Sequence, residues 1–258
     1  MATQEYPQTA ANKVNRYGNR ANYDAEFIHG LVNTTPVLHV SFNPEPGSLT
    51  PIILPMIGQV GQYPGDEEPH VYLHGYVSSR IMKMGADSTS EGLPLCVAAT
   101  KIDGYVLALT PNSHSYNYRS AVLQGTATVI TDLEERLWAM HLVTNSVVAD
   151  RWENTRVPPD NVELQSTRIM KMKITTASAK VRDGGPEDDK KDLKRDGVVA
   201  KTWTGVIPFY ERLGAPIAST YNKVKTVPNY IKTFVDKQNE VAQRTANEAA
   251  MLEYGKKK

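Results

Sequence analysis

Two segments of the sequence combine hydroxyl groups with cations where a chain can bind phosphate. In the first, an apolar run at Val71–Leu73 precedes a short helical pattern that opens with Ser78, Ser79 and Arg80. The start of a helix offers unpaired backbone N–H groups and the positive end of its dipole, so it stabilises an anion. The hydroxyls add donors, and a guanidinium can bind two phosphate oxygens at once. Lys83 extends the cationic edge.

Taken alone, the first segment favours a simpler interpretation. Capping serines are common, so the serines would cap the helix and the two cations would be solvated. The second segment shifts the balance towards phosphate binding. Tyr118, Arg119 and Ser120 lead into an apolar strand pattern and add a second guanidinium beside an aromatic ring. Arg119 could bind either the ring edge of a cofactor or its phosphate.

Two histidines, His74 and His114, lie beside these segments and are the catalytic candidates. A histidine that closes a strand with a satisfied hydrogen bond explains His74 equally well. Other chemistries lack a motif. The six histidines are not spaced as metal ligands, and the sequence has neither a G-x-S-x-G elbow nor a G-x-G-x-x-G fingerprint. We therefore expect no metal site.

Composition narrows the class of protein. The chain of 258 residues has a net charge of +1, which gives no general attraction to nucleic acid or to an anionic membrane. The single cysteine, Cys96, excludes an intrachain disulfide, and it lies in an apolar run. No apolar run approaches membrane-spanning length, and the polar N-terminus lacks a secretory core. We expect a cytoplasmic protein without a membrane or nucleic-acid partner.

The elements that must position these residues are mostly short strands. Apolar spacing predicts helices at Tyr23–Val32, at Asp132–Val148 with a capping box from Thr131 to Glu134, and at Asn229–Tyr254. Asp103-Gly104, between two apolar runs, predicts a hairpin turn. Many short strands with such turns are typical of a barrel or sandwich. The strand patterns are Pro36–Phe42, Thr50–Val60, Val71–His74, Leu93–Ile102, Tyr105–Leu109, Ala121–Thr131, Ser166–Thr175 and Val198–Phe209.

The ordered set of motifs resembles the pyridoxamine-phosphate-oxidase-like flavin proteins, specifically the branch that includes the nitroimidazole-resistance proteins. The resemblance covers about Asn19–Pro208. Its carriers are Tyr23-Asp24, Pro55-Met56, Leu73-His74-Gly75, Ser79-Arg80, Asp103-Gly104, Asn117-Tyr118-Arg119-Ser120, Gly125, Ala179-Lys180-Val181-Arg182, Trp203 and Gly205-Val206-Ile207-Pro208. The resemblance implies a mainly β fold, an antiparallel Greek-key split barrel of six or seven strands with flanking helices. It also implies a homodimer that holds flavin mononucleotide (FMN) between its subunits.

The same resemblance implies roles for individual residues and a domain plan. The cofactor-binding candidates are Pro55, Met56, His74, Ser78, Ser79, Arg80, Lys83, Tyr118, Arg119 and Ser120. The first serine-arginine segment would clamp the phosphate, the strand at Pro55-Met56 would face the ring edge, and Arg119 would serve a second edge. We expect a flexible N-terminal arm over residues 1–22, a split-barrel flavin-binding domain over 23–213 and a C-terminal helical extension over 214–258.

Three functions fit this interpretation. The leading one is an FMN-dependent oxidoreductase that passes electrons from a reduced nicotinamide, NADH or NADPH, to a small aromatic, nitro or quinone-like acceptor. The second is a haem-binding split-barrel protein in which His74 or His114 is the axial ligand. The third is a non-catalytic flavin-binding or interaction module whose C-terminal helix is a partner surface.

Overall fold

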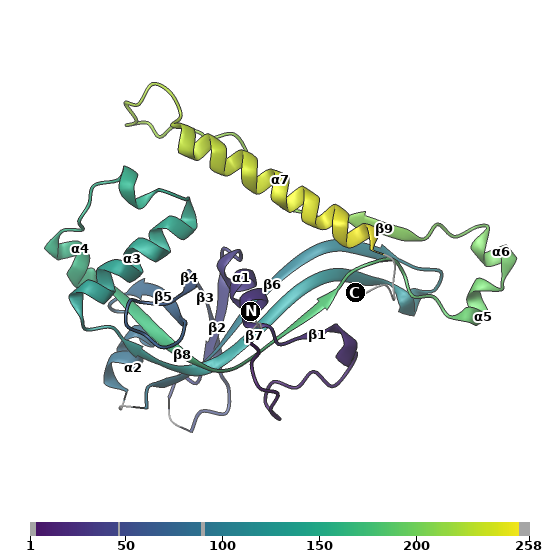
Figure 1. The fold of residues 1–258 in the computed structure, drawn as a ribbon, viewed down its shortest axis with the longest axis horizontal. Coiled ribbons are helices and arrows are strands. Elements are labelled where there is room, and N and C mark those ends of the chain that lie inside the picture. The colour runs from purple at the N-terminus through teal and green to yellow at the C-terminus, as the bar shows by residue number, and fades with distance from the viewer. Residues whose placement is uncertain (1–3, 46, 89–90, 253–258) are drawn as a thin grey trace. The chain divides into compact units, whose positions relative to one another are not determined.

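The chain forms two compact units. The structure, a computed structural model, describes residues 4–45, 47–88 and 91–252. Unit 1 comprises Met1–Thr100 and Ser120–Lys180, and unit 2 comprises Lys101–Arg119 and Val181–Lys258. Three long strands contribute residues to both units (Figure 1): β6 (Leu93–Leu107), β7 (Ser115–Val129) and β8 (Thr167–Arg182). The domain boundaries expected at residues 22 and 213 stay a prediction.

Within the described ranges the strands form one nine-stranded sheet. Its main path has the order β3-β2-β6-β7-β8-β5-β4, and β1 and β9 pair off this path with β8 and β6. The remaining strands are β1 (Ala21–Asn22), β2 (Leu38–Phe42), β3 (Ile52–Met56), β4 (Gly58–Gly61), β5 (His70–Tyr76) and β9 (Gly205–Pro208). The seven strands of the main path agree with the six or seven expected, and the short β1 and β9 are additional.

The predicted hairpin turn at Asp103-Gly104 is wrong. Strand β6 continues through both residues to Leu107, and the chain reverses only between β6 and β7. Gly104 pairs with Pro208 of β9. A Cβ atom on Gly104 would lie 3.1 Å from the Ile207 carbonyl oxygen, so a glycine is needed for the close approach of β9. The Asp-Gly pair therefore serves a strand pairing rather than a turn.

Other strand predictions differ in extent. The pattern Thr50–Val60 divides at Ile57 into β3 and β4, and Ser166–Thr175 lies inside the longer β8. Of the predicted final strand Val198–Phe209, only β9 (Gly205–Pro208) pairs within the sheet. Trp203 precedes this strand. Its ring occupies the space beside Gly205, where a Cβ atom would meet it at 2.7 Å.

Side-chain caps start the two helices predicted around the barrel. Helix α1 (Ala25–Asn33) is capped by Asp24, whose Oδ1 accepts from the Phe27 N–H at 2.7 Å. Helix α3 (Leu133–Val147) is capped by Asp132, which accepts from the Glu135 N–H at 2.8 Å. The cap is thus one residue later than the predicted capping box. The other α-helices are α2 (Arg80–Asp87), α4 (Asn161–Ser166), α5 (Lys190–Leu193), α6 (Asp196–Val199) and α7 (Asn229–Met251).

Helix α7 confirms the predicted C-terminal helix as far as Met251, and Tyr254 lies outside the described residues. It is the longest of the helices drawn in Figure 1. No helix in the described ranges is both long enough and apolar enough to cross a membrane.

The core of unit 1 lies between the strands and α1. Leu38 and Val40 of β2, Leu73 of β5 and Met170 of β8 are fully buried. Burying an aliphatic side chain of this size contributes about 1.5–3 kcal/mol relative to exposure. These buried side chains therefore fix which face of each strand points into the core. They also fix the orientation of β5, from which the chain leads into α2.

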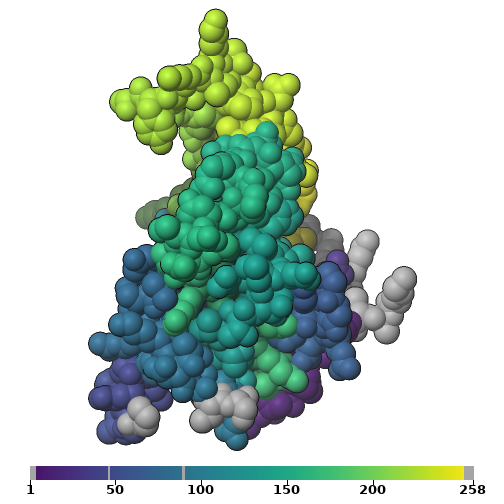
Figure 2. All heavy atoms as spheres, turned by 90° about the vertical axis from the view of Figure 1, so that its left-hand side faces the viewer, coloured from purple at the N-terminus to yellow at the C-terminus, as the bar shows by residue number. Residues whose placement is uncertain are grey.

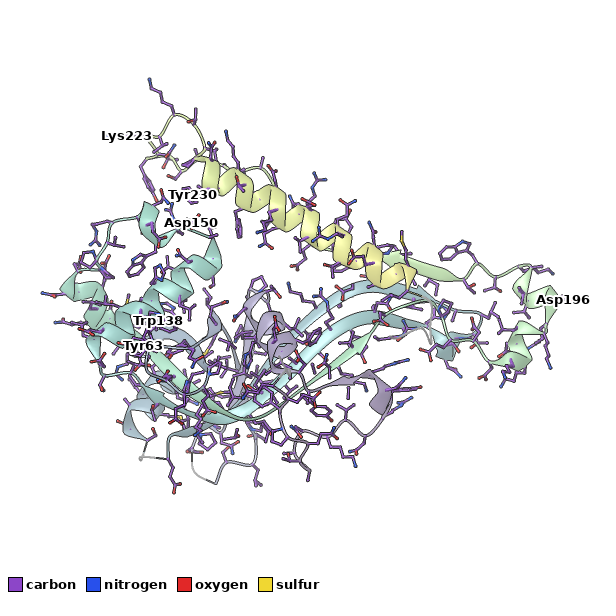
Figure 3. All side chains as sticks on the ribbon, in the orientation of Figure 1. Tyr63, Trp138, Asp150, Asp196, Lys223 and Tyr230 are labelled. Atoms are coloured by element: carbon purple, nitrogen blue, oxygen red, sulfur yellow. The ribbon has the colours of Figure 1, made fainter. Side chains whose placement is uncertain are left out.

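Aromatic rings attach α3 to the sheet of unit 1. The Trp138 ring on α3 makes edge contacts with Tyr72 of β5 and with Tyr63, with centroid distances of 5.1 and 5.6 Å. Figure 3 labels Tyr63 and Trp138, whose side chains lie side by side. Such edge contacts are worth about 0.5–1.5 kcal/mol beyond the area they bury.

Unit 2 is organised around a buried arginine on β8. The Arg182 guanidinium donates to the side-chain oxygen of Asn117 and to the carbonyl oxygens of Gly184 and Gly185. The Asn117 amide in turn donates to the Gly184 carbonyl oxygen at 3.1 Å and to that of Ala249 in α7 at 3.3 Å. These bonds tie the end of α7 to β7 and β8.

Candidate cofactor site

The start of α2 is the best-formed candidate site, and it lies in unit 1. Ser79 occupies the N-cap position with extended backbone angles, and its N–H donates to the Tyr76 carbonyl oxygen at 2.9 Å. Its side chain makes no capping hydrogen bond. The hydroxyl oxygen is buried and has no hydrogen-bond partner. The simple interpretation of a capping serine is therefore wrong for Ser79, although the helix begins where the sequence predicted.

Two cations stand beside this hydroxyl on the first turn of α2. The side chains of Arg80 and Lys83 are exposed, and Ser78 is exposed as well. In the part of the chain that the structure describes, neither cation forms an ion pair, and the first turn of α2 contains no acidic residue. The positive charge of this turn is thus not neutralised by the protein, which favours an anion at the helix start.

The structure brings Met56 to the same region. A side chain at Gly75, at the end of β5, would meet the Met82 methyl carbon at 2.6 Å and that of Met56 at 3.7 Å. The end of β3 and the turn into α2 are therefore neighbours. Met56 is buried, whereas Pro55 is exposed on β3 opposite His39 of β2. Pro55 and Met56 thus lie on β3, the outer strand at one end of the sheet path. Their contact with the ring edge of a cofactor stays a prediction.

His74 lies in this region with its side chain exposed. Its backbone N–H donates to the Ile57 carbonyl oxygen at 3.1 Å, and the residue pairs with Ile169 of β8. Partial desolvation by the surrounding atoms lowers the pKa of its ring below the ordinary value. Neutral imidazole is thus its favoured form near pH 7.

Tyr118 and Arg119 lie in unit 2, where Arg119 has a carboxylate partner. Its Nε and Nη2 donate to the two oxygens of Asp103, each at 2.7 Å. The Asp103 side chain is only 6% exposed. This edge of the guanidinium is occupied by a bidentate pair, so it cannot also grip a phosphate. Asp103 was not predicted to take part, because the sequence placed it in a turn.

Two more residues shape the surroundings of Arg119. Burial and the charge of Arg119 lower the pKa of Lys101, while Asp103 and Glu211 act in the opposite direction. Lys101 carried no motif in the sequence, and only the pairing of the strands reveals its place beside Arg119. Ser120 belongs to unit 1, and its hydroxyl donates to the Lys180 carbonyl oxygen at 3.2 Å.

His114, in unit 2, has one ring nitrogen fixed by the backbone. Its Nδ1 lies 2.9 Å from the Thr110 carbonyl oxygen, and the side chain is exposed. A carbonyl oxygen can only accept, so the neutral ring carries its hydrogen on Nδ1 and leaves the Nε2 lone pair available. Among the described residues, no group of three or more histidine, cysteine or acidic side chains could hold a metal ion.

The chain is similar to a known protein family and to several solved structures. The model of the family described as pyridoxamine 5'-phosphate oxidase matches residues 24–181. No curated protein matches the chain. Among solved structures, the flavocytochrome Anf3 from Azotobacter vinelandii is 27% identical, with a TM-score of 0.73 over 88% of this chain and 97% of that one.

Two further solved structures are similar to this chain. The FAD and haem binding protein from Mycobacterium smegmatis is 26% identical, with a TM-score of 0.70 over 84% of this chain and 97% of that one. A putative 5-nitroimidazole antibiotic resistance protein from Bacteroides thetaiotaomicron is 18% identical, with a TM-score of 0.47 over 62% of this chain and 86% of that one. The expected mainly β, split-barrel fold class is confirmed. Because the matched residues make up more than half of the sequence, the chain belongs to the pyridoxamine 5'-phosphate oxidase family.

Proposed function

We propose that this protein binds the phosphate group of a flavin at the start of α2 and acts as a flavin-dependent redox protein. The family supports this proposal, as do two similar proteins described as a flavocytochrome and as an FAD and haem binding protein. The observation that carries it is the Ser79 hydroxyl, buried at a helix N-cap without a partner. Such a hydroxyl costs free energy, and a phosphate oxygen would supply the missing hydrogen bond.

The neighbouring residues would bind and orient the cofactor. Arg80 would bind two phosphate oxygens through its planar guanidinium, and Lys83, one turn later, would add a point charge. Met56 would give an apolar surface beside the phosphate-binding turn. When bound, the flavin would supply the redox chemistry, and the protein would supply position and electrostatics.

The proposed flavin is FMN, and FAD is the alternative, because both carry the phosphate that the start of α2 would recognise. The proposed electron donor is NADH or NADPH, and the acceptor is a small aromatic, nitro or quinone-like molecule. Mass spectrometry of the flavin released from purified protein distinguishes FMN from FAD. Bleaching of the yellow absorbance by NADH or NADPH tests the electron transfer. A yellow protein that neither donor bleaches would favour a non-catalytic flavin-binding module.

Substitution of Arg80 tests the phosphate site. Arg80→Ala should weaken FMN binding about 10-fold to 100-fold, since a charge-assisted hydrogen bond contributes about 1.5–3 kcal/mol. It should leave the affinity for riboflavin, which lacks the phosphate, nearly unchanged. Ser79→Ala should weaken FMN in the same selective way, without loss of stability in the flavin-free protein. Equal losses for FMN and riboflavin would show that α2 does not bind the phosphate.

A second candidate function, haem binding, is favoured by the same two similar structures. His114 has the arrangement typical of a metal-ligating histidine, since its Nδ1 hydrogen is donated to a carbonyl oxygen and Nε2 is left available. Titration with haemin should give a Soret band that His114→Ala removes. His39→Ala, which alters an exposed histidine on β2, is the control, and His74→Ala tests the other candidate. A band that survives both His114→Ala and His74→Ala would exclude these ligands.

We also propose a homodimer. Large apolar side chains of unit 2 are strongly exposed, with Ile217 at 95%, Tyr221 at 84% and Trp203 at 67%. Pairing with a second chain would cover such side chains, and two-fold pairing of identical chains is the commonest form of pairing. Light scattering should report twice the chain mass of 28.6 kDa. A monomer that retains its flavin would contradict both the dimer and a cofactor site shared between subunits.

A further inference from the structure

Two hollows in unit 1 share a pair of arginines in their lining. The first, of about 390 Å³, lies between α3, α4 and the start of β8, and the second, of about 460 Å³, lies between the end of α2 and β7. Arg136 of α3 and Arg168 of β8 line both. Figure 2 looks onto this side of the structure, where α3 and α4 appear in teal and green. Each volume is in the range of about 300–1,000 Å³ that small-molecule sites occupy.

Neither arginine has a counter-charge within the described ranges. No aspartate or glutamate lines either hollow, and neither guanidinium forms an ion pair there. The hydrogen bond that Arg168 Nη1 donates to the Met82 carbonyl oxygen is long, at 3.4 Å. A guanidinium keeps its charge at any physiological pH, so two positive charges face these hollows.

Arg136 gives a second, independent sign of a missing ligand. Its Nε is buried and has no hydrogen-bond partner. A buried donor without an acceptor is uncommon in native proteins and lowers stability. The remaining walls combine amides and hydroxyls, including Asn161, Gln165 and Ser88, with apolar side chains such as Leu164. The oxyanion of a ligand would accept hydrogen bonds from the two arginines. An apolar group of the same ligand would cover Leu164.

We propose that these hollows form a second binding site, which takes a small organic anion whose carboxylate or phosphate group is held by Arg136 and Arg168. The site goes beyond the proposed flavin site, because it uses neither Ser79 nor Arg80. Carboxylates and phosphates share the geometry that a guanidinium fork recognises. The polar and apolar walls together favour a ligand that carries both an oxyanion and an apolar group.

Calorimetric titration of the purified, flavin-loaded protein tests this site. The probes are phenylacetate and phenyl phosphate, with benzyl alcohol as the neutral analogue and inorganic phosphate as the anion without an apolar group. At least one aromatic anion should bind with a dissociation constant of about 1 mM or tighter. Benzyl alcohol and inorganic phosphate should each bind about 10-fold more weakly or worse. The stronger of the two aromatic anions identifies the preferred oxyanion.

Arginine variants assign the binding to these residues. Arg136→Gln and Arg168→Gln should each weaken the preferred probe about 10-fold or more, as expected for a lost charge-assisted bond. Arg156→Gln is the matched control, because this exposed arginine already pairs with Glu163 and lines neither hollow. If Arg136→Gln fails to fold, Arg136→Lys and Arg168→Gln carry the test. Failure of both aromatic anions to bind, or binding that Arg168→Gln leaves unchanged, would overturn the proposal.

The variant Arg80→Ala separates this proposal from the flavin site. It should lower flavin occupancy and leave the affinity of the aromatic anion unchanged within about twofold. Anion binding that disappears together with the flavin would mean that the two sites are one, which would also overturn the proposal.

Discussion

Lys171 of β8 ties α3 to the sheet, and its removal should destabilise the protein. Its ammonium lies 2.8 Å from Asp66 Oδ1 and 2.7 Å from Glu135 Oε1. The Tyr72 hydroxyl lies 3.3 and 3.2 Å from the same two carboxylates, but it has only one hydrogen to donate. In Lys171→Met the two carboxylates would share that single donor, and the remaining cationic candidate would be the His70 ring, whose Nδ1 lies 3.4 Å from Asp66 Oδ2.

The magnitude follows from burial. The side chains of Lys171, Asp66 and Glu135 are 19%, 18% and 15% exposed, so solvent screens their charges only in part. Breaking a buried pair costs about 3–5 kcal/mol, whereas an exposed pair is worth about 0–1 kcal/mol. Since some solvent still reaches this cluster, we expect Lys171→Met to lower the free energy of unfolding by about 2–3 kcal/mol.

The pH dependence distinguishes a charge effect from a packing effect. Burial alone would raise the pKa of Asp66, but its hydrogen bond to Lys171 and the charges of Lys171 and His70 outweigh burial and hold it below the ordinary value. Burial alone would lower the pKa of Lys171, but its hydrogen bonds to Asp66 and Glu135 and their charges raise it above the ordinary value.

The sign of each contribution follows by linkage. The lowered pKa of Asp66 stabilises the fold above about pH 4, and this stability is lost as the pH falls through the folded value. The raised pKa of Lys171 stabilises the fold below about pH 10, and this stability is lost as the pH rises through the folded value. Burial and the charge of Lys171 also lower the pKa of His70, so in Lys171→Met this ring can take a charge beside Asp66 more easily below about pH 7. The difference between wild type and Lys171→Met should therefore be flat from about pH 7 to 9 and shrink on either side.

Urea unfolding followed by tryptophan fluorescence measures this difference, because Trp138 lies in the same aromatic cluster. Lys173→Met is the matched control on the same strand. Lys173 is 64% exposed and lies 3.2 Å from Glu68, so its loss should cost at most about 0.5 kcal/mol. Equal losses for the two variants, or a Lys171→Met loss that persists unchanged at acid pH, would refute the electrostatic account.

Four further single variants and one double variant test the fold by urea unfolding. Gly125→Ala should lower the free energy of unfolding by more than about 3 kcal/mol, because the new methyl group would lie 1.8 Å from the Lys173 carbonyl oxygen. Gly30→Ala, which has open space around it in α1, should raise the free energy of unfolding by about 0.5–1 kcal/mol. Asp103→Asn should cost about 1–3 kcal/mol because it removes the charge paired with Arg119, and Arg119→Gln in the same chain should recover part of the loss. Asp160→Ala should cost about 0.5–2 kcal/mol, since its side chain accepts from the N–H groups of Val162 and Glu163 at the start of α4, and a loss near zero would show that this capping box is redundant.

Elements with local signals could be predicted from the sequence. Helices α1 and α3 begin beside an aspartate that caps them, and α7 carries its apolar stripe within one continuous segment. The extent of the strands could not be predicted in the same way. Asp103-Gly104 has the composition of a turn, but β9, about a hundred residues later, pairs with it and makes the close approach that requires the glycine. A partner so distant in sequence leaves no local trace.

For the candidate sites, too, the sequence shows the residue types but not the partners that the fold gives them. The sequence shows Arg80, Arg119 and Arg136 as equal cations, yet their partners differ in the structure. Arg119 is neutralised by Asp103, so its removal should appear mainly as a loss of stability. Arg80 has no such partner in the described ranges, so its removal should appear mainly as a loss of ligand affinity. The Arg136 Nε lacks even a hydrogen-bond acceptor, and only the fold reveals that it is buried. Whether an arginine binds a ligand or stabilises the protein is therefore decided by which carboxylates the strands bring to it.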